Sequence, residues 1–159
     1  MREAVRRKDR EITDLGRIAD ILQAAQAASI AFSGEEPYVI PMNYGFTYDG
    51  GEFKLYIHGA KDGKKVDRML ENPRVAFSVY TDNLVYGEGS EGSSYTSRFD
   101  CVCGEGVVTM LSGEDKKRAF HAIMAHYAPG REFTFDARVL EHTMAAEIAV
   151  EKITGKHHD

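Results

Sequence analysis

The stretch that decides the fold is YVIPMNYGFTYDGGEFKLYIH, residues 38–58, in which hydrophobic side chains recur at every second position. A period of two is typical of a β-strand with one buried face. Gly50 and Gly51 follow Asp49 and supply the backbone freedom of a tight turn, so the stretch predicts an antiparallel hairpin. The inward residues are Tyr38, Ile40, Met42, Tyr44, Phe46 and Tyr48 on the first strand, and Phe53, Leu55 and Ile57 on the second.

The rest of the chain continues this β pattern and adds helices. Further strands are predicted at residues 28–32, 74–81, 95–111 and 145–153, and helices at 14–27, 62–72 and 112–127. Gly104 and Gly106 indicate a bulge or barrel corner, and Ser112 with Asp115 resembles a capping box. The segment 86–94 is rich in glycine and serine and predicts a mobile loop. Six or seven strands without βαβ alternation predict a mainly β fold, a closed or split antiparallel barrel with flanking helices.

Length and composition narrow the class of protein. The 159 residues fit one domain, residues 1–159, with an N-terminal arm at 1–12 and a C-terminal tail at 154–159. A net charge of −5 without a broad basic tract argues against nucleic acid as a partner. No apolar run is long enough to span a membrane and no signal peptide is evident, so a cytoplasmic location is expected.

The only cysteines are Cys101 and Cys103, two positions apart in an expected strand. Their side chains face the same way but stand too far apart for an unstrained disulfide, which suits a reducing compartment. No further His or Cys lies at the spacing of a zinc site, so no metal is predicted. His157 and His158 are read as part of a polar tail.

The helix predicted at 62–72 has Val66, Met69 and Leu70 on one apolar stripe, and three lysines, Lys61, Lys64 and Lys65, crowd its start. The helix dipole already places positive charge there, so the lysines reverse the usual preference. An anion held by backbone amides and ammonium groups would explain the arrangement. The alternative is that the three side chains point into water.

No motif of nucleophilic catalysis, Walker type or dinucleotide-binding type occurs in the chain. What remains is a candidate phosphate pocket beside a strand whose outer face is stripped of bulk at Asn43 and Gly45. A flat, phosphorylated cofactor would use both features, one for its anion and one for its ring system.

A set of motifs resembles the nitroimidazole-resistance (nitroimidazole reductase-like) family of FMN-binding split barrels related to pyridoxamine 5'-phosphate oxidase. The motifs are RRKDREIT at 6–13, PYVIPMNYGF at 37–46, LYIHGAKDGKKVDRMLENPRVAFSV at 55–79, CVCGEGVV at 101–108 and ITGK at 153–156. The resemblance implies a six-stranded antiparallel split β-barrel. It also implies a homodimer with FMN in two equivalent clefts at the subunit interface.

The resemblance also assigns residues to the cofactor. It implies that Lys64 and Lys65, with Lys61, hold the flavin phosphate, and that the strand from Pro41 to Tyr44 lies along the ring. The implied cofactor-binding residues are Pro41, Met42, Asn43, Tyr44, His58, Gly59, Lys61, Gly63, Lys64, Lys65 and, from the second subunit, Ser97. Many relatives have serine where this chain has Gly59. The chain therefore lacks a hydroxyl that could contact the phosphate, and the lysines and backbone amides are expected to bind it instead.

The implied function is that of an FMN-dependent oxidoreductase that reduces a small molecule such as a nitro-aromatic compound. His58 is the expected catalytic residue, as a proton donor or substrate-orienting group. One alternative is a non-catalytic flavin or haem carrier, in which His58, His121 or His126 ligates haem. The helical histidines are otherwise expected to flank the core stripe of their helix. Another alternative is a deazaflavin cofactor.

Overall fold

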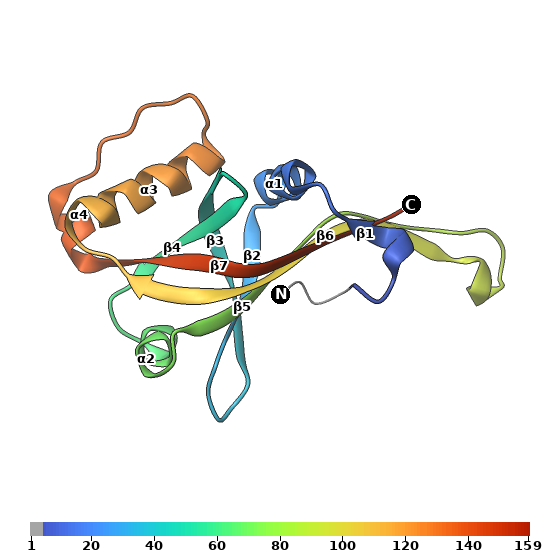
Figure 1. The fold of residues 1–159 in the computed structure, drawn as a ribbon, viewed down its shortest axis with the longest axis horizontal. Helices are drawn as coiled ribbons and strands as arrows, with labels where there is room; N and C mark the ends of the chain where they lie inside the picture. The colour runs from blue at the N-terminus through green and yellow to red at the C-terminus, as the bar shows by residue number, and fades with distance from the viewer. Residues whose placement is uncertain (1–4) are drawn as a thin grey trace.

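A computed structural model describes residues 5–159, which form a barrel of antiparallel strands with helices packed around it (Figure 1). The elements are η1 (Lys8–Arg10), β1 (Glu11–Ile12), α1 (Leu15–Ala24), β2 (Ala27–Phe32), β3 (Tyr38–Asp49), β4 (Glu52–Ala60), α2 (Lys64–Glu71), β5 (Arg74–Tyr86), η2 (Gly92–Ser94), β6 (Thr96–Met110), α3 (Gly113–Tyr127), α4 (Ala137–His142) and β7 (Thr143–His158).

Six strands close the barrel in the order β7-β4-β3-β2-β5-β6, and β6 pairs with β7 to complete the ring. Every pairing is antiparallel. The two-residue strand β1 adds to the side of β7. The prediction of a mainly β, six-stranded antiparallel barrel with flanking helices is confirmed.

The barrel interior is filled by most of the hydrophobic side chains that the period of two placed inward. Tyr48, also expected inward, is instead 40% exposed near the end of β3. Fully buried examples from four strands are Tyr44, Leu55, Ile57, Val79 and Ile148. Helix α1 packs Ile18, Ile21 and Leu22 into the same core. Its first residue follows Asp14, whose carboxylate accepts a hydrogen bond of 2.8 Å from the amide of Gly16 and so caps the helix.

The glycines of β6 mark a bend of the barrel, as predicted. The register between β6 and β7 shifts between Glu105 and Gly106. A Cβ atom on Gly104 would lie 2.3 Å from the ring of Phe77, so only glycine allows β5 and β6 to pack this closely.

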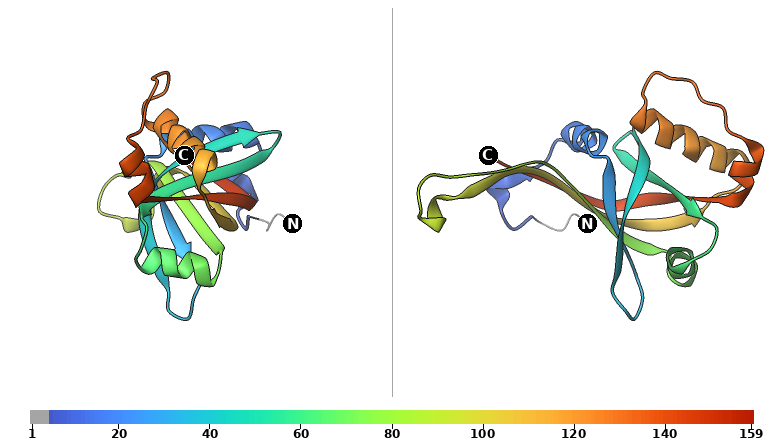
Figure 2. Two further views of the ribbon diagram at one scale, coloured as in Figure 1. Left: turned by 90° about the vertical axis from the view of Figure 1, so that its left-hand side faces the viewer. Right: turned by 180° about the vertical axis from the view of Figure 1, so that it is seen from behind.

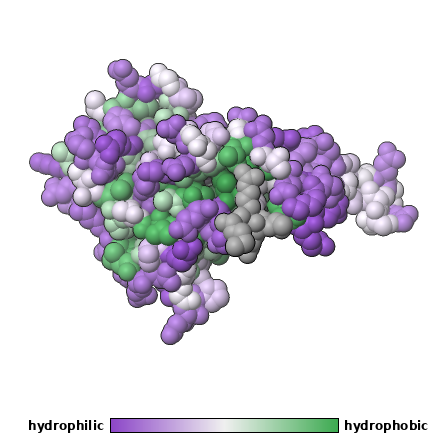
Figure 3. Space-filling model, in the orientation of Figure 1, coloured by the Kyte–Doolittle hydropathy of each residue, from purple (hydrophilic) through white to green (hydrophobic). Residues whose placement is uncertain are grey.

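The hairpin of β5 and β6 continues beyond the barrel as a projecting arm, with η2 at its tip (Figures 1 and 2). The segment predicted as a loop at 86–94 forms this tip. Hydrophobic residues gather over the barrel in Figure 3, whereas the projecting end is mostly hydrophilic in that view.

Two terminal predictions are wrong. Residues 154–158 are not a tail, because β7 runs to His158 and pairs there with β6. Of the predicted N-terminal arm, residues 1–4 lie outside the described part, while Glu11 and Ile12 pair with β7. The side chains at this end of β7 are polar and show no alternating hydrophobic pattern, so the sequence did not indicate that its backbone pairs as a strand.

Three helix details also differ from the prediction. Leu70 is 67% exposed and does not share the buried stripe of Val66 and Met69 on α2. Ser112 precedes α3, but its side chain makes no capping hydrogen bond, so the predicted capping box is absent. Helix α4 was not predicted, since its six residues are too few for a clear helical period. Within residues 5–159, no helix is long and apolar enough to span a membrane.

Candidate functional site

Strand β3 changes partner halfway along its length. Residues 38–43 pair with β2, and residues 44–49 pair with β4, beginning at the pair of Tyr44 and Ile57. Strand β4 continues past this pair, but His58, Gly59 and Ala60 pair only with β7. Residues 41–43 of β3 and 58–60 of β4 therefore present edges that no strand of the described barrel occupies. We call this opening the split.

Backbone edges without a strand partner expose N–H and C=O groups that a ligand can use. The split therefore offers hydrogen-bonding groups from two strands to a planar molecule with a polar edge. Its residues Pro41 to Asn43, His58 and Gly59 belong to the set that the family resemblance assigned to a cofactor.

The basic segment follows directly from β4 and leads into α2. Gly63 stands before the helix with φ of 112°, a conformation that favours glycine. The amides of Val66 and Asp67 already bond the carbonyl of Gly63. The amides of Lys64 and Lys65 come before these bonds, as the first free N–H groups of a helix do.

The three lysines of this segment point in different directions. The ammonium of Lys64 lies 3.8 Å from the carboxylate of Glu36 and 4.8 Å from the ring centre of Tyr38. Within residues 5–159, neither Lys61 nor Lys65 forms an ion pair, so two cations at the split are uncompensated. Lys61 is exposed and Lys65 is partly buried, so an anion at the helix start would meet these two cations without a competing carboxylate.

Gly59 makes room for Lys65. A Cβ atom on Gly59 would lie 2.7 Å from Cε and 3.1 Å from Nζ of Lys65. The lysine side chain thus crosses the strand where any larger residue would displace it. Glycine in place of the serine of many relatives therefore leaves room for the Lys65 side chain, which the sequence did not indicate.

His58 lies half-buried between the split and α3. Its ring centre is 5.6 Å from that of Phe120. Within the described residues, no hydrogen bond to the imidazole is found. Burial, and next the charge of Lys65, lower the pKa of His58. The ring is therefore neutral at neutral pH and is free to bind or orient a ligand.

Lys116 is a cation near the split that the sequence analysis missed. It lines a cavity of about 340 Å³ together with Lys61 and Met144. Burial and the charge of Lys61 lower the pKa of Lys116. Lys116 is on α3, and only the folded chain brings it to a residue 55 positions earlier, so no local pattern marks it.

The prediction of a bare strand face for a ring system is wrong at Gly45. Helix α3 covers this position so closely that a Cβ atom would lie 2.4 Å from the backbone of Ala122 and Ile123. The side-chain amide of Asn43 donates hydrogen bonds of 3.0 Å to the carbonyl of Gln26 and to the hydroxyl of Tyr127. The absence of a side chain at Gly45 therefore allows α3 to pack against β3.

The remaining predicted residues differ in what they can offer. Met42 and Tyr44 point into the core, so only their backbone can face a ligand. The side chain of Pro41 is exposed at the split. Ser97 is on the projecting arm, at the end of the molecule away from α2 (Figures 1 and 2), and one chain does not bring it to the lysines.

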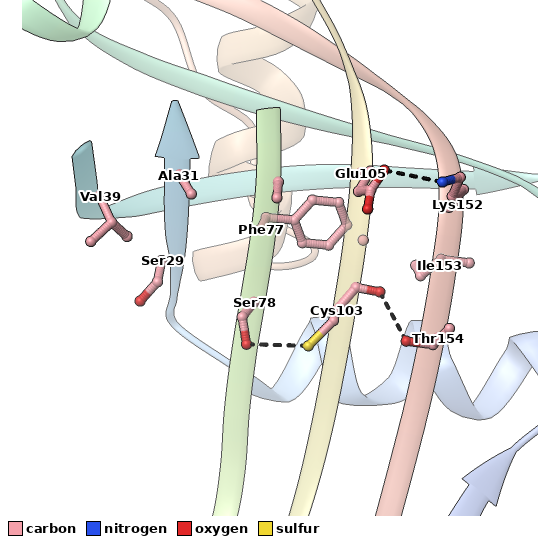
Figure 4. Close-up of a pocket in the computed structure, with 12 residues that line it drawn as sticks. Ser29, Ala31, Val39, Phe77, Ser78, Cys103, Glu105, Lys152, Ile153 and Thr154 are labelled. Carbon is pink, nitrogen blue, oxygen red and sulfur yellow. Dashed lines mark hydrogen bonds and ion pairs between the residues drawn. The ribbon is translucent and has the colours of Figure 1, made fainter. Parts of the chain in front are cut away.

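A separate groove of about 370 Å³ lies on the outer face of the barrel (Figure 4). Small side chains line it, among them Ser29, Ala31, Ala76 and Ser78. Cys103 lies between β5 and β7 at its centre, and the ion pair of Lys152 and Glu105 closes one end at 3.4 Å.

A six-stranded antiparallel barrel that closes through β6 and β7 and opens where β3 changes partner is a split β-barrel. The family model described as pyridoxamine 5'-phosphate oxidase matches residues 14–157. The chain therefore belongs to the pyridoxamine 5'-phosphate oxidase-like family, which confirms the resemblance noted in its sequence. A search of curated proteins found no match.

Solved structures of similar fold come from several bacteria. One is a candidate 5-nitroimidazole antibiotic resistance protein from Bacteroides thetaiotaomicron, with TM-score 0.79 and 26% identity over 92% of this chain and 86% of that one. Another is a FAD and heme binding protein from Mycobacterium smegmatis, with TM-score 0.80 and 20% identity over 94% and 74%. A flavocytochrome from Azotobacter vinelandii has TM-score 0.78 and 21% identity over 99% and 73%.

Proposed function

We propose that this protein is a flavin-dependent oxidoreductase that binds FMN at the split and passes electrons to a small acceptor such as a nitro-aromatic compound. The observation that carries the proposal is the meeting of two unpaired strand edges with two uncompensated lysines. The names of the similar structures, which mention flavin, heme and 5-nitroimidazole resistance, support the same class of chemistry.

The phosphate of FMN would be held at the start of α2. A phosphate carries nearly two negative charges at neutral pH. Lys61 and Lys65 supply positive charge, and the amides of Lys64 and Lys65 supply donors aligned with the helix dipole. Lys64 adds a third cation if it leaves Glu36, from which it is 3.8 Å away.

The ring would lie along the split, where the edges of residues 41–43 and 58–60 donate and accept hydrogen bonds. Bound FMN supplies the electron transfer, while the protein positions it. His58 lies on the edge of the split, and its neutral ring has no hydrogen-bond partner among the described residues, so its N–H can orient the acceptor. It would pass on a proton only after taking one from solvent.

We also propose a homodimer in which the arm of one protomer reaches the cofactor of the other. The arm carries exposed large side chains, Leu84, Val85, Tyr86 and Tyr95, each 44–66% exposed. Such a cluster is unfavourable in water and is typical of a contact surface. This arrangement would give Ser97 its implied role. The two free thiols fit the proposed cytoplasmic location.

A haem-binding role is the second candidate, and the free imidazole of His58 favours it. The other two candidate ligands are less suited. The Nδ1 of His126 lies 2.6 Å from the carbonyl of Tyr44 and its Nε2 lies 3.2 Å from that of Gln23, so both nitrogens are engaged. His121 packs on Phe135, with 4.9 Å between ring centres.

The test is the visible absorption spectrum of the gently purified protein, followed by titration of the flavin-free form with FMN, FAD, a deazaflavin and haem. We expect FMN to bind, and the double substitution Lys64→Ala/Lys65→Ala to weaken it about 100-fold, as the loss of two charge-assisted contacts implies. Lys117→Ala, which removes an exposed lysine of α3, serves as the matched control and should leave affinity unchanged.

Equal loss in both variants would remove the lysines from the site. Binding of haem without flavin would favour the second candidate. Retained FMN binding without reduction of nitro-aromatic compounds by any of the common electron donors would support a carrier instead of an enzyme.

A further inference from the structure

The two cysteines stand side by side on the outer face of β6. Their Sγ atoms are 3.7 Å apart, and both thiols are free. Cys103 is exposed and lines the groove of Figure 4, while Cys101 is half-buried. One face of one strand therefore holds two sulfur atoms side by side, and one of them, that of Cys103, lies in the groove.

The neighbouring strands surround the pair with polar groups. The hydroxyl of Ser78 on β5 lies 3.6 Å from the sulfur of Cys103. On β7, Lys156 is opposite Cys101 and Thr154 is opposite Cys103. A hydrogen bond from the Cys101 thiol, then the nearby Ser78 and Lys156, lower the pKa of Cys103, which makes one of the two sulfurs readily ionised.

The geometry suits a bridging atom better than a disulfide. Alternate residues of a strand have Cα atoms about 6.6–6.8 Å apart, which is the upper limit for a disulfide. An atom that forms bonds of about 2.3 Å to sulfur would span 3.7 Å at an angle of about 107°, close to tetrahedral.

A metal ion would need more ligands than the pair provides. Within residues 5–159, no group of three or more His, Cys, Asp and Glu side chains is placed to hold one. A trivalent arsenic atom that carries one organic substituent needs only two sulfur ligands. The groove beside Cys103 offers space for that substituent among Ala31, Ala76 and Ile153.

We propose that Cys101 and Cys103 form a two-thiol site that captures a trivalent organoarsenical of the type R–As(OH)₂. Each thiol proton leaves with one arsenic-bound hydroxide as water. Two As–O bonds break and two As–S bonds form, and arsenic remains trivalent, so no oxidant or reductant is needed. The proposal is independent of the flavin function proposed above.

The test uses phenylarsine oxide, which hydrates to the required form, on the full-length folded protein. We expect intact-mass analysis to show one phenylarsenic group per chain. That group should persist in excess 2-mercaptoethanol and be removed by the dithiol 2,3-dimercaptopropanol. The chain contains only these two cysteines, so the readout is unambiguous. Cys101→Ser and Cys103→Ser should each lose the adduct when 2-mercaptoethanol is present.

Thermal unfolding shows whether the folded geometry matters. A ligand that binds the folded chain in preference to the unfolded one raises Tm, so phenylarsine oxide should raise the Tm of the wild-type protein and leave that of both serine variants unchanged. The proposal is overturned by an adduct that 2-mercaptoethanol displaces from wild type as easily as from the variants. It is also overturned by the absence of an adduct, or by a Tm that falls or stays constant.

Discussion

The two halves of β3 have the same bare outer face but different neighbours. Residues 44–49 pair with β4 and lie beneath α3, where Gly45 touches the helix backbone. Residues 38–43 pair with β2 instead and leave one edge open at the split. The covered half provides close packing, and the open half provides backbone groups for a ligand.

The contrast teaches that a missing side chain has no fixed meaning in a strand. Gly45 faces a rigid helix backbone, whereas Gly59 at the split faces the flexible end of Lys65. The first glycine fixes the position of α3, and the second positions a cation. Adding a methyl group at each position separates the two roles.

Gly45→Ala should have the largest effect on stability. The new Cβ atom would lie 2.4 Å from the α3 backbone, which cannot move without disturbing its packing. Overpacking of this kind costs about 1–3 kcal/mol, which corresponds to a fall in Tm of roughly 2–12 °C at this chain length. Thermal unfolding measures the effect.

Two other glycines serve as controls for this prediction. Gly92→Ala meets no atom within 4 Å and should leave Tm unchanged. Gly59→Ala displaces only the end of Lys65, so it should change stability by less than about 0.5 kcal/mol but weaken FMN binding. Equal Tm values for the substitutions at 45 and 92 would contradict the difference between the two halves.

Tyr127→Phe should have a smaller effect, at the boundary between the two halves. The hydroxyl of Tyr127 donates to the carbonyl of Gln26 and accepts from the side chain of Asn43 and, at 3.2 Å, from the amide of Tyr44. Losing this connection between α3 and β3 should cost about 1 kcal/mol, or roughly 2–4 °C in Tm.

Tyr48→Phe is the matched control, because within the described residues the hydroxyl of Tyr48 makes no hydrogen bond. Its ring stacks on Phe53 with 4.5 Å between centres, a contact that phenylalanine retains. Flavin affinity should stay unchanged in Tyr48→Phe and fall slightly in Tyr127→Phe, because Tyr127 holds the side chain of Asn43 beside the split. Equal affinity in the two variants would show that the split does not depend on this contact.

The sequence predicts the barrel well because a period of two is a local property of the chain. It marks the strands, their inward faces and the glycines of β6 directly. The change of partner in β3 is not local, since it depends on which strands lie beside each half. Nothing in the sequence around Gly45 therefore distinguishes helix packing from an open edge.

The same distinction between local and non-local features applies to the candidate site. Lys61, Lys64, Lys65 and His58 are close in sequence, so the nearness of their backbones could be predicted, whereas the different directions of the lysine side chains could not. Lys116 comes to Lys61 only through the packing of α3, and the end of β7 is recognised as a strand only by its pairing with β6 and β1. Side-chain patterns carry little information where polar residues form a strand.

The smallest expected effect is electrostatic and belongs to the split. The charge of Lys65 contributes, after burial, to the lowered pKa of His58. Lys65→Met removes that charge and keeps the side-chain length, so the pKa of His58 should rise toward its ordinary value of about 6.5. An NMR titration of the imidazole measures this directly. Lys64→Met is the control, because Lys64 lies over Tyr38 and contributes nothing to the shift.

The sign of the accompanying stability change follows from proton binding. Because the folded pKa of His58 is lowered, the unfolded chain binds more protons between the two pKa values, and stability rises with pH there. The contribution of His58 to the free energy of unfolding is complete above about pH 6.5. It is lost as pH falls through the pKa of His58 in the folded protein. Lys65→Met should narrow this window without closing it, since burial, the larger cause, remains. An unchanged His58 titration in this variant would place Lys65 away from the ring and weaken the case for a cation at the open edge.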